Sequence, residues 1–96
     1  MKIRFLQAAS REMRKAARRY EGEAEGLGDR FLGVVSKNIL HVSEFPYAGK
    51  VVGELRAIAV RSFPYSVIYG IDQDEVVIVA VAHYRMRPGY WQEREI

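Results

Sequence analysis

The sequence contains no cysteine, which excludes disulfide bonds, cysteine nucleophiles and thiolate metal sites. Its longest apolar run, Val76 to Ala82, has the length of a strand, whereas a membrane helix needs roughly 20 apolar residues. The basic start of the chain is not followed by the apolar stretch of a signal peptide. We therefore expect a protein of the reducing cytoplasm that does not engage a membrane.

At 96 residues the chain is expected to form a single domain, residues 1–96, with a modest core. The formal net charge is +3. All of this excess lies in residues 1–49, which carry nine Lys or Arg and six Asp or Glu, while residues 50–96 carry six of each. A polyanionic partner and an ordinary basic surface explain this balance equally well.

The first half of the chain predicts a short strand and two helices. Alternation from Lys2 to Leu6 indicates a strand, and small apolar residues at helical spacing predict a helix from Ala8 to about Glu25. Ser10 is a candidate cap for its start. The opposite face is basic and carries Arg11, Arg14, Lys15, Arg18 and Arg19. A second helix is predicted from about Asp29 to Glu44, and the short connection favours an antiparallel helical hairpin.

The second half of the chain has the period of strands. We expect strands at Leu55–Val60, Tyr65–Ile71 and Val76–Ala82. The last of these is apolar on both faces and is therefore placed in the centre of the sheet, with the N-terminal strand on its far side. The predicted fold is α+β: a helical hairpin packed on a mainly antiparallel four-stranded sheet, followed by a C-terminal tail.

Most residues capable of chemistry follow the ends of two of these strands. Hairpin connectivity places Arg61 and His83 at the same end of the sheet. Arginine forks suit phosphate, histidine can transfer protons, and aromatic rings can stack on bases. The alternative is that the arginines pair with carboxylates and the aromatic residues seal the core. The residues of this stretch are Arg61, His83, Arg85, Arg87, Tyr90 and Trp91.

Several motifs resemble those of the RelE/ParE family of bacterial toxins from type II toxin–antitoxin systems. They are AARRYE and GLGDRF in the helices, LRAIAVRSFPYSVIY in the middle strands, and VVIVAVAHYRMRPGYWQER at the end of the chain. The resemblance implies a fold of a helical hairpin against an antiparallel sheet. It also implies a growth-arresting toxin that a cognate antitoxin neutralises.

Members of the family differ in mechanism, and the resemblance implies two. RelE-like toxins cleave mRNA on the ribosome without metal, whereas ParE-like toxins poison DNA gyrase by binding. We favour mRNA cleavage, because His83, Arg85 and the aromatic pair Tyr90 and Trp91 cluster in the sequence. Gyrase poisoning is the alternative, and an inactive homologue that only binds its antitoxin is a third.

The resemblance also implies residue roles and partners. The expected partners are the antitoxin and either the ribosome with mRNA or DNA gyrase, with operator DNA reached only through the antitoxin. No metal or cofactor is expected. The loop before the arginine strand departs from the RelE pattern, because it has a single lysine. The expected catalytic residues are Arg61, His83, Arg85 and Tyr90, and the expected substrate-binding residues are Lys50, Arg56, Arg87 and Trp91.

Overall fold

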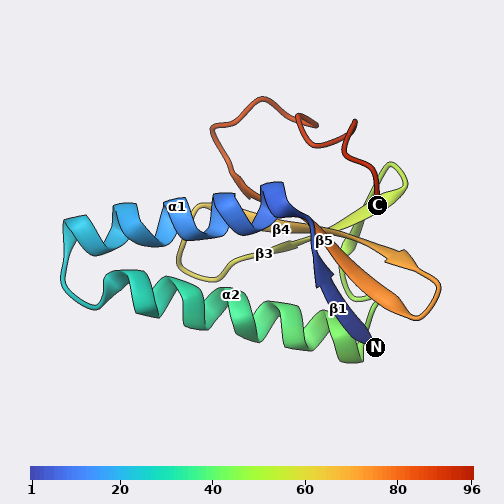
Figure 1. Ribbon diagram of the computed structural model, residues 1–96, viewed down its shortest axis with the longest axis horizontal. Coiled ribbons are helices and arrows are strands. Elements are labelled where there is room, and N and C mark those ends of the chain that lie inside the picture. The colour runs from blue at the N-terminus through green and yellow to red at the C-terminus, as the bar shows by residue number, and fades with distance from the viewer.

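The computed structural model describes all 96 residues as two helices on a five-stranded sheet (Figure 1). The sheet order is β1-β5-β4-β3-β2, in which β1 runs parallel to β5 and all other pairs are antiparallel. Neither helix is long and apolar enough to cross a membrane. The elements in chain order are β1 (Lys2–Phe5), α1 (Gln7–Glu23), α2 (Leu27–Glu44), β2 (Lys50–Val52), β3 (Leu55–Ala59), β4 (Tyr65–Asp72) and β5 (Glu75–His83).

The predicted α+β fold is confirmed, with one strand more than the four expected. The additional strand is β2, which pairs with β3 at the edge of the sheet. It has three residues and two of them are exposed, so it carries no alternation of apolar and polar residues that a sequence pattern could reveal. The predicted cap is also corrected, because α1 begins at Gln7, before Ser10, and no side chain caps it.

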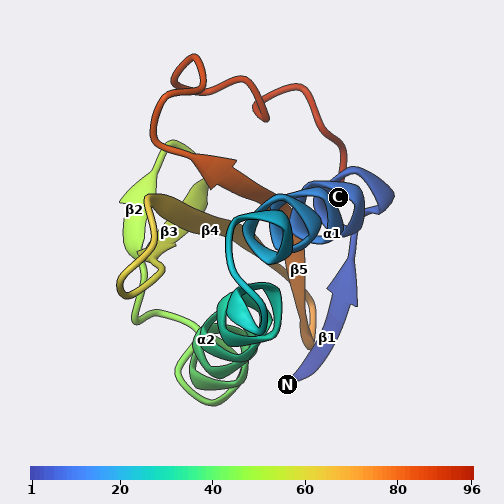
Figure 2. The ribbon, with the colours of Figure 1, turned by 90° about the vertical axis from the view of Figure 1, so that its left-hand side faces the viewer.

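The two helices lie antiparallel on one face of the sheet (Figures 1 and 2). They approach closely where Gly28 faces Ala17, since a Cβ atom at Gly28 would lie 2.5 Å from the Ala17 carbonyl oxygen. The Glu21 carboxylate accepts hydrogen bonds from the backbone N–H groups of Gly26 and Gly28, at 2.9 and 3.0 Å. One side chain of α1 thus satisfies free N–H groups at the start of α2.

Strand β5 is the buried centre of the sheet, as its apolar sequence predicts. Ile68 of β4 pairs with Ala80, whereas Tyr69 pairs with Ile78, so Val79 is an extra residue that forms a β-bulge. The bulge lets Ile78 and Val81 both join the core beneath the helices, although they are an odd number of residues apart. A smaller apolar cluster, which includes Val79, covers the opposite face under the C-terminal tail.

Candidate functional site at one end of the sheet

The ends of β3 and β5 lie at the same end of the sheet, as hairpin connectivity predicts. Tyr65, the first residue of β4, pairs with His83, the last residue of β5. The Val60 N–H donates a 2.9 Å hydrogen bond to the Tyr65 carbonyl oxygen, so Arg61 leaves β3 at this end. Arg61 is exposed and precedes Ser62, whose φ of 71° makes a tight left-handed turn. The register thus gathers Arg61 and His83 at one rim.

His83 is held in one orientation by its neighbours. Its Nδ1 atom accepts a 2.9 Å hydrogen bond from the Arg85 backbone N–H, and its ring packs edge-on against Tyr65 with centroids 4.9 Å apart. The Tyr65 hydroxyl in turn accepts a 2.8 Å hydrogen bond from the guanidinium of Arg19 on α1. Because Nδ1 is an acceptor, the neutral imidazole carries its proton on Nε2, which is the nitrogen available to a ligand.

The surroundings of His83 favour its neutral form. Desolvation lowers its pKa below the ordinary value of 6.5, and the positive charges of Arg19 and Arg85 lower the pKa further. No carboxylate raises the pKa of His83. At neutral pH His83 is therefore a neutral side chain beside two cations, and it can donate a hydrogen bond through Nε2.

Tyr90 is bound within the protein. Its hydroxyl donates a 2.6 Å hydrogen bond to Glu12 on α1, and Arg94 binds the same carboxylate through Nη1 at 3.0 Å and Nη2 at 2.9 Å. Burial and then the hydrogen bond to Glu12 raise the pKa of Tyr90. Sequence reasoning missed Glu12 and Arg94. The only available signal was that Glu12 is the one acidic residue between Ala8 and Tyr20.

The same pair satisfies backbone groups of β5 beyond the end of β1. Glu12 accepts a 3.1 Å hydrogen bond from the Val81 N–H, and Arg94 donates a 2.8 Å bond to the Val79 carbonyl. These groups lie at the β-bulge, where the regular ladder is interrupted. The tail is therefore fastened to both the sheet and α1 by one ion pair.

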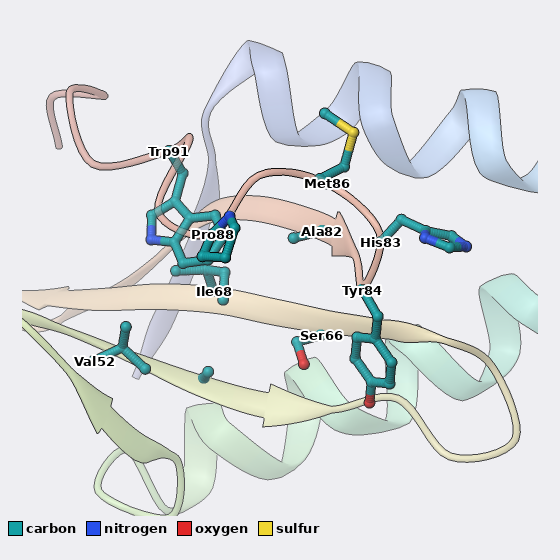
Figure 3. Close-up of a pocket in the computed structure, with 10 residues that line it drawn as sticks. Val52, Ser66, Ile68, Ala82, His83, Tyr84, Met86, Pro88 and Trp91 are labelled. Atoms are coloured by element: carbon teal, nitrogen blue, oxygen red, sulfur yellow. The ribbon is translucent and has the colours of Figure 1, made fainter.

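Trp91 lies on the face of the sheet away from the helices. Figure 3 shows Trp91 and Pro88 together over Ile68 of β4, where they bound an apolar pocket of about 230 Å³. Arg85 and Arg87, in the segment between His83 and Trp91, are exposed. The pocket is lined by Val52, Ala57, Ser66, Ile68, Ala82, His83, Tyr84, Met86, Pro88 and Trp91.

Two of the expected substrate-binding residues lie away from this rim. Arg56 donates hydrogen bonds to the carbonyl oxygens of Tyr47 and Gly49, at 3.2 and 2.9 Å, and its guanidinium lies 5.0 Å from the centroid of the Tyr47 ring. Lys50 is on β2, three strands from His83 on β5, or roughly 14 Å across the sheet. Arg56 thus holds the loop before β2, and Lys50 is separated from the histidine.

A second cavity, of about 400 Å³, opens between α1 and the end of β5. Lys15 and Arg19 of the basic helix face reach it, and His83 borders it from the sheet. Sequence reasoning placed these two cations on a solvated or polyanion-binding face and did not connect them with His83. The lining residues are Glu12, Lys15, Ala16, Arg19, Tyr65, Val81, His83, Met86 and Tyr90.

The chain is thus a helical hairpin on an open five-stranded sheet, followed by a basic and aromatic tail. The family described as ParE toxin of type II toxin–antitoxin system, parDE, matches residues 3–88, and the chain belongs to this family. The structure is similar to one titled "Chromosomal ParDE TA system from P. aeruginosa". The TM-score is 0.72 at 13% identity, over 86% of this chain and 95% of that chain. No curated protein sequence matches the chain.

Proposed function

We propose that the chain arrests growth by binding DNA gyrase and trapping it on cleaved DNA, rather than by cutting mRNA. The observation that carries the proposal is the hydrogen bond of Tyr90, whose hydroxyl donates to the Glu12 carboxylate at 2.6 Å. A tyrosine held in this way is not free to act on a scissile phosphate. Arg56 is likewise occupied by two backbone carbonyls, and Lys50 lies three strands from His83. A binding function needs none of these groups.

The surface that remains free suits a binding role. Arg61 and Arg85 are exposed at this end of the sheet, beside the exposed side chain of Tyr84, and Arg87 is exposed in the tail that follows. Arginine and tyrosine dominate the binding energy of many protein interfaces. We assign the contact with gyrase to this rim, and we expect the antitoxin to prevent that contact.

The test measures both mechanisms with the same protein. Purified toxin, incubated with gyrase, ATP and supercoiled plasmid, is expected to accumulate gyrase-linked linear DNA. Primer extension on translated mRNA from induced cells is expected to show no new ends. The double variant Arg61→Gln, Arg85→Gln should lose most of the gyrase effect. Arg30→Gln, on the exposed surface of α2, is the matched control and should retain it.

mRNA cleavage is the second candidate, and a specific observation favours it. His83 has a lowered pKa, presents Nε2 and shares the rim with Arg61 and Arg85. New mRNA ends that disappear in His83→Asn, together with unaffected gyrase, would replace the first proposal with this one. A protein that does neither and leaves growth unchanged would be a homologue that only binds its antitoxin.

A further inference from the structure

The cavity between α1 and β5 is bordered by two cations that form no ion pair. Lys15 and Arg19 border it, and neither forms an ion pair, since the only ion pairs of the molecule join Arg4 to Asp72 and Glu75, and Arg94 to Glu12. Glu12 is the one acid in the lining, and its two oxygens are occupied by Arg94, Tyr90 and the Val81 N–H. Glu23, one turn after Arg19, lies near enough to Tyr65 to raise its pKa, but neither it nor Glu12 forms an ion pair with Lys15 or Arg19.

The donors of this cavity come from two elements, and two of them, Arg19 and His83, are held in place. Arg19 is positioned by its hydrogen bond to Tyr65 and by its place over the Tyr20 ring, 5.2 Å from the centroid. His83 is oriented by Arg85 so that Nε2 carries the available proton. A guanidinium, an ammonium and an imidazole N–H therefore border one space. Such a set suits an oxyanion with several acceptor oxygens.

Charge and size indicate which oxyanion fits. A phosphate monoester carries about −1.5 to −2 at neutral pH and three acceptor oxygens, which matches two cations and a third donor. A carboxylate or an internal phosphodiester carries a single negative charge. The cavity, at about 400 Å³, is within the range of small-molecule sites, and Ala16, Val81 and Met86 provide apolar walls.

We infer that this cavity is a binding site for a terminal phosphate, that of a nucleoside monophosphate or of the phosphorylated end of a nucleic-acid strand. Lys15 and Arg19 bind the phosphate oxygens, and His83 donates through Nε2. Met86, the exposed apolar residue of the wall, contacts the adjoining nucleoside. The site adjoins the exposed arginine rim through His83, while Lys15 and Arg19 come from α1 and are not part of that rim.

The two histidines of the chain allow a direct test by imidazole NMR. His83 borders the cavity, whereas His41 lies in the last turn of α2 and serves as an internal control. Adenosine 5′-monophosphate is expected to shift the His83 signals and raise the His83 pKa, and to leave the His41 signals unchanged. Adenosine at the same concentration should shift neither. Equal shifts with adenosine, or no His83 shift with the monophosphate, would overturn the assignment.

Variants of α1 separate the site from general basic charge. Arg19→Gln should weaken monophosphate binding by roughly tenfold, the loss of one charge-assisted hydrogen bond. Arg19 also binds Tyr65, so its replacement can disturb the protein as well as the site. Lys15→Gln avoids this problem, because Lys15 is exposed and forms no hydrogen bond or ion pair in the protein. Arg18→Gln has the same charge change but lies outside the cavity, and should alter the Kd by about twofold or less. Equal effects of all three variants would contradict a defined site.

Short oligonucleotides identify the source of the phosphate. Single-stranded DNA and RNA with a 5′-phosphate are compared with the same strands lacking it. A His83 shift that requires the phosphate, in DNA, in RNA or in the mononucleotide alone, supports the site and names its ligand. An equal shift with unphosphorylated strands would mean backbone binding and would refute the terminal-phosphate assignment.

Discussion

Glu12 and Arg94 form an ion pair that joins the first helix to the end of the chain, with Nη2 of Arg94 2.9 Å from Oε2 of Glu12. The side chains of both are 22% exposed, so the pair is largely buried but still in contact with solvent. Each partner also satisfies a backbone group at the β5 bulge. The pair therefore fixes the tail that carries Tyr90 and follows His83.

We expect Glu12→Gln to reduce the free energy of unfolding by about 2 kcal/mol, since charge-assisted hydrogen bonds are weakened and Arg94 loses its partner. Urea denaturation measures the change. The double variant Glu12→Gln, Arg94→Met closes a mutant cycle with the two single variants, and the destabilisations should be clearly less than additive. Additive effects would mean that the contact contributes nothing to stability.

Tyr90→Phe is expected to cost about 1 kcal/mol of stability through the lost hydrogen bond to Glu12. Gyrase trapping should persist, because the hydroxyl is already used inside the protein. Urea denaturation and the plasmid cleavage reaction are measured on the same sample. Complete loss of activity with unchanged stability would instead give the hydroxyl a direct role at the target.

Stability should decrease as the pH falls below about 6.5. Desolvation, Arg19 and Arg85 lower the pKa of His83 in the folded protein, so the unfolded chain binds the proton more readily over the range between that pKa and 6.5. Unfolding midpoints measured from pH 7.5 to 5 would reveal the slope. His83→Asn should make that slope shallower, and an unchanged slope would remove His83 as its source.

Gly49→Ala is expected to destabilise the fold by about 1–3 kcal/mol. A Cβ atom there would lie 2.6 Å from the Tyr69 hydroxyl and 3.0 Å from the Ala57 carbonyl oxygen. That hydroxyl binds the Gly49 N–H and the Pro46 carbonyl, so the loop before β2 would shift.

Gly33→Ala is the matched control for this substitution. No atom lies within 4 Å of the added Cβ at Gly33, and the residue is inside α2. Alanine should therefore stabilise the helix by up to about 1 kcal/mol. Thermal unfolding of both variants gives the comparison. Destabilisation of similar size at the two positions would point to loss of glycine in general rather than to a steric clash at Gly49.

Sequence reasoning predicted the features that depend on local pattern. Apolar spacing identified both helices, and the run from Val76 to Ala82 identified the central strand, because burial on both faces leaves no polar position. Hairpin connectivity placed Arg61 and His83 at one end, since antiparallel strands alternate in direction. The short edge strand β2 was missed because a strand of three residues, two of them exposed, carries no periodic signal.

The sequence by itself determined the α+β fold, the central strand and the placement of Arg61 and His83 at one end of the sheet, because each follows from side-chain period or strand direction. Only the tertiary structure decided which polar side chains are free. Tyr90 and Arg94 bind Glu12, from which they are separated by 78 and 82 positions in the sequence. Arg56 donates a hydrogen bond to a backbone carbonyl of the loop before β2. Such contacts depend on how the tail and α1 pack against the bulged end of β5, and no local pattern encodes that packing.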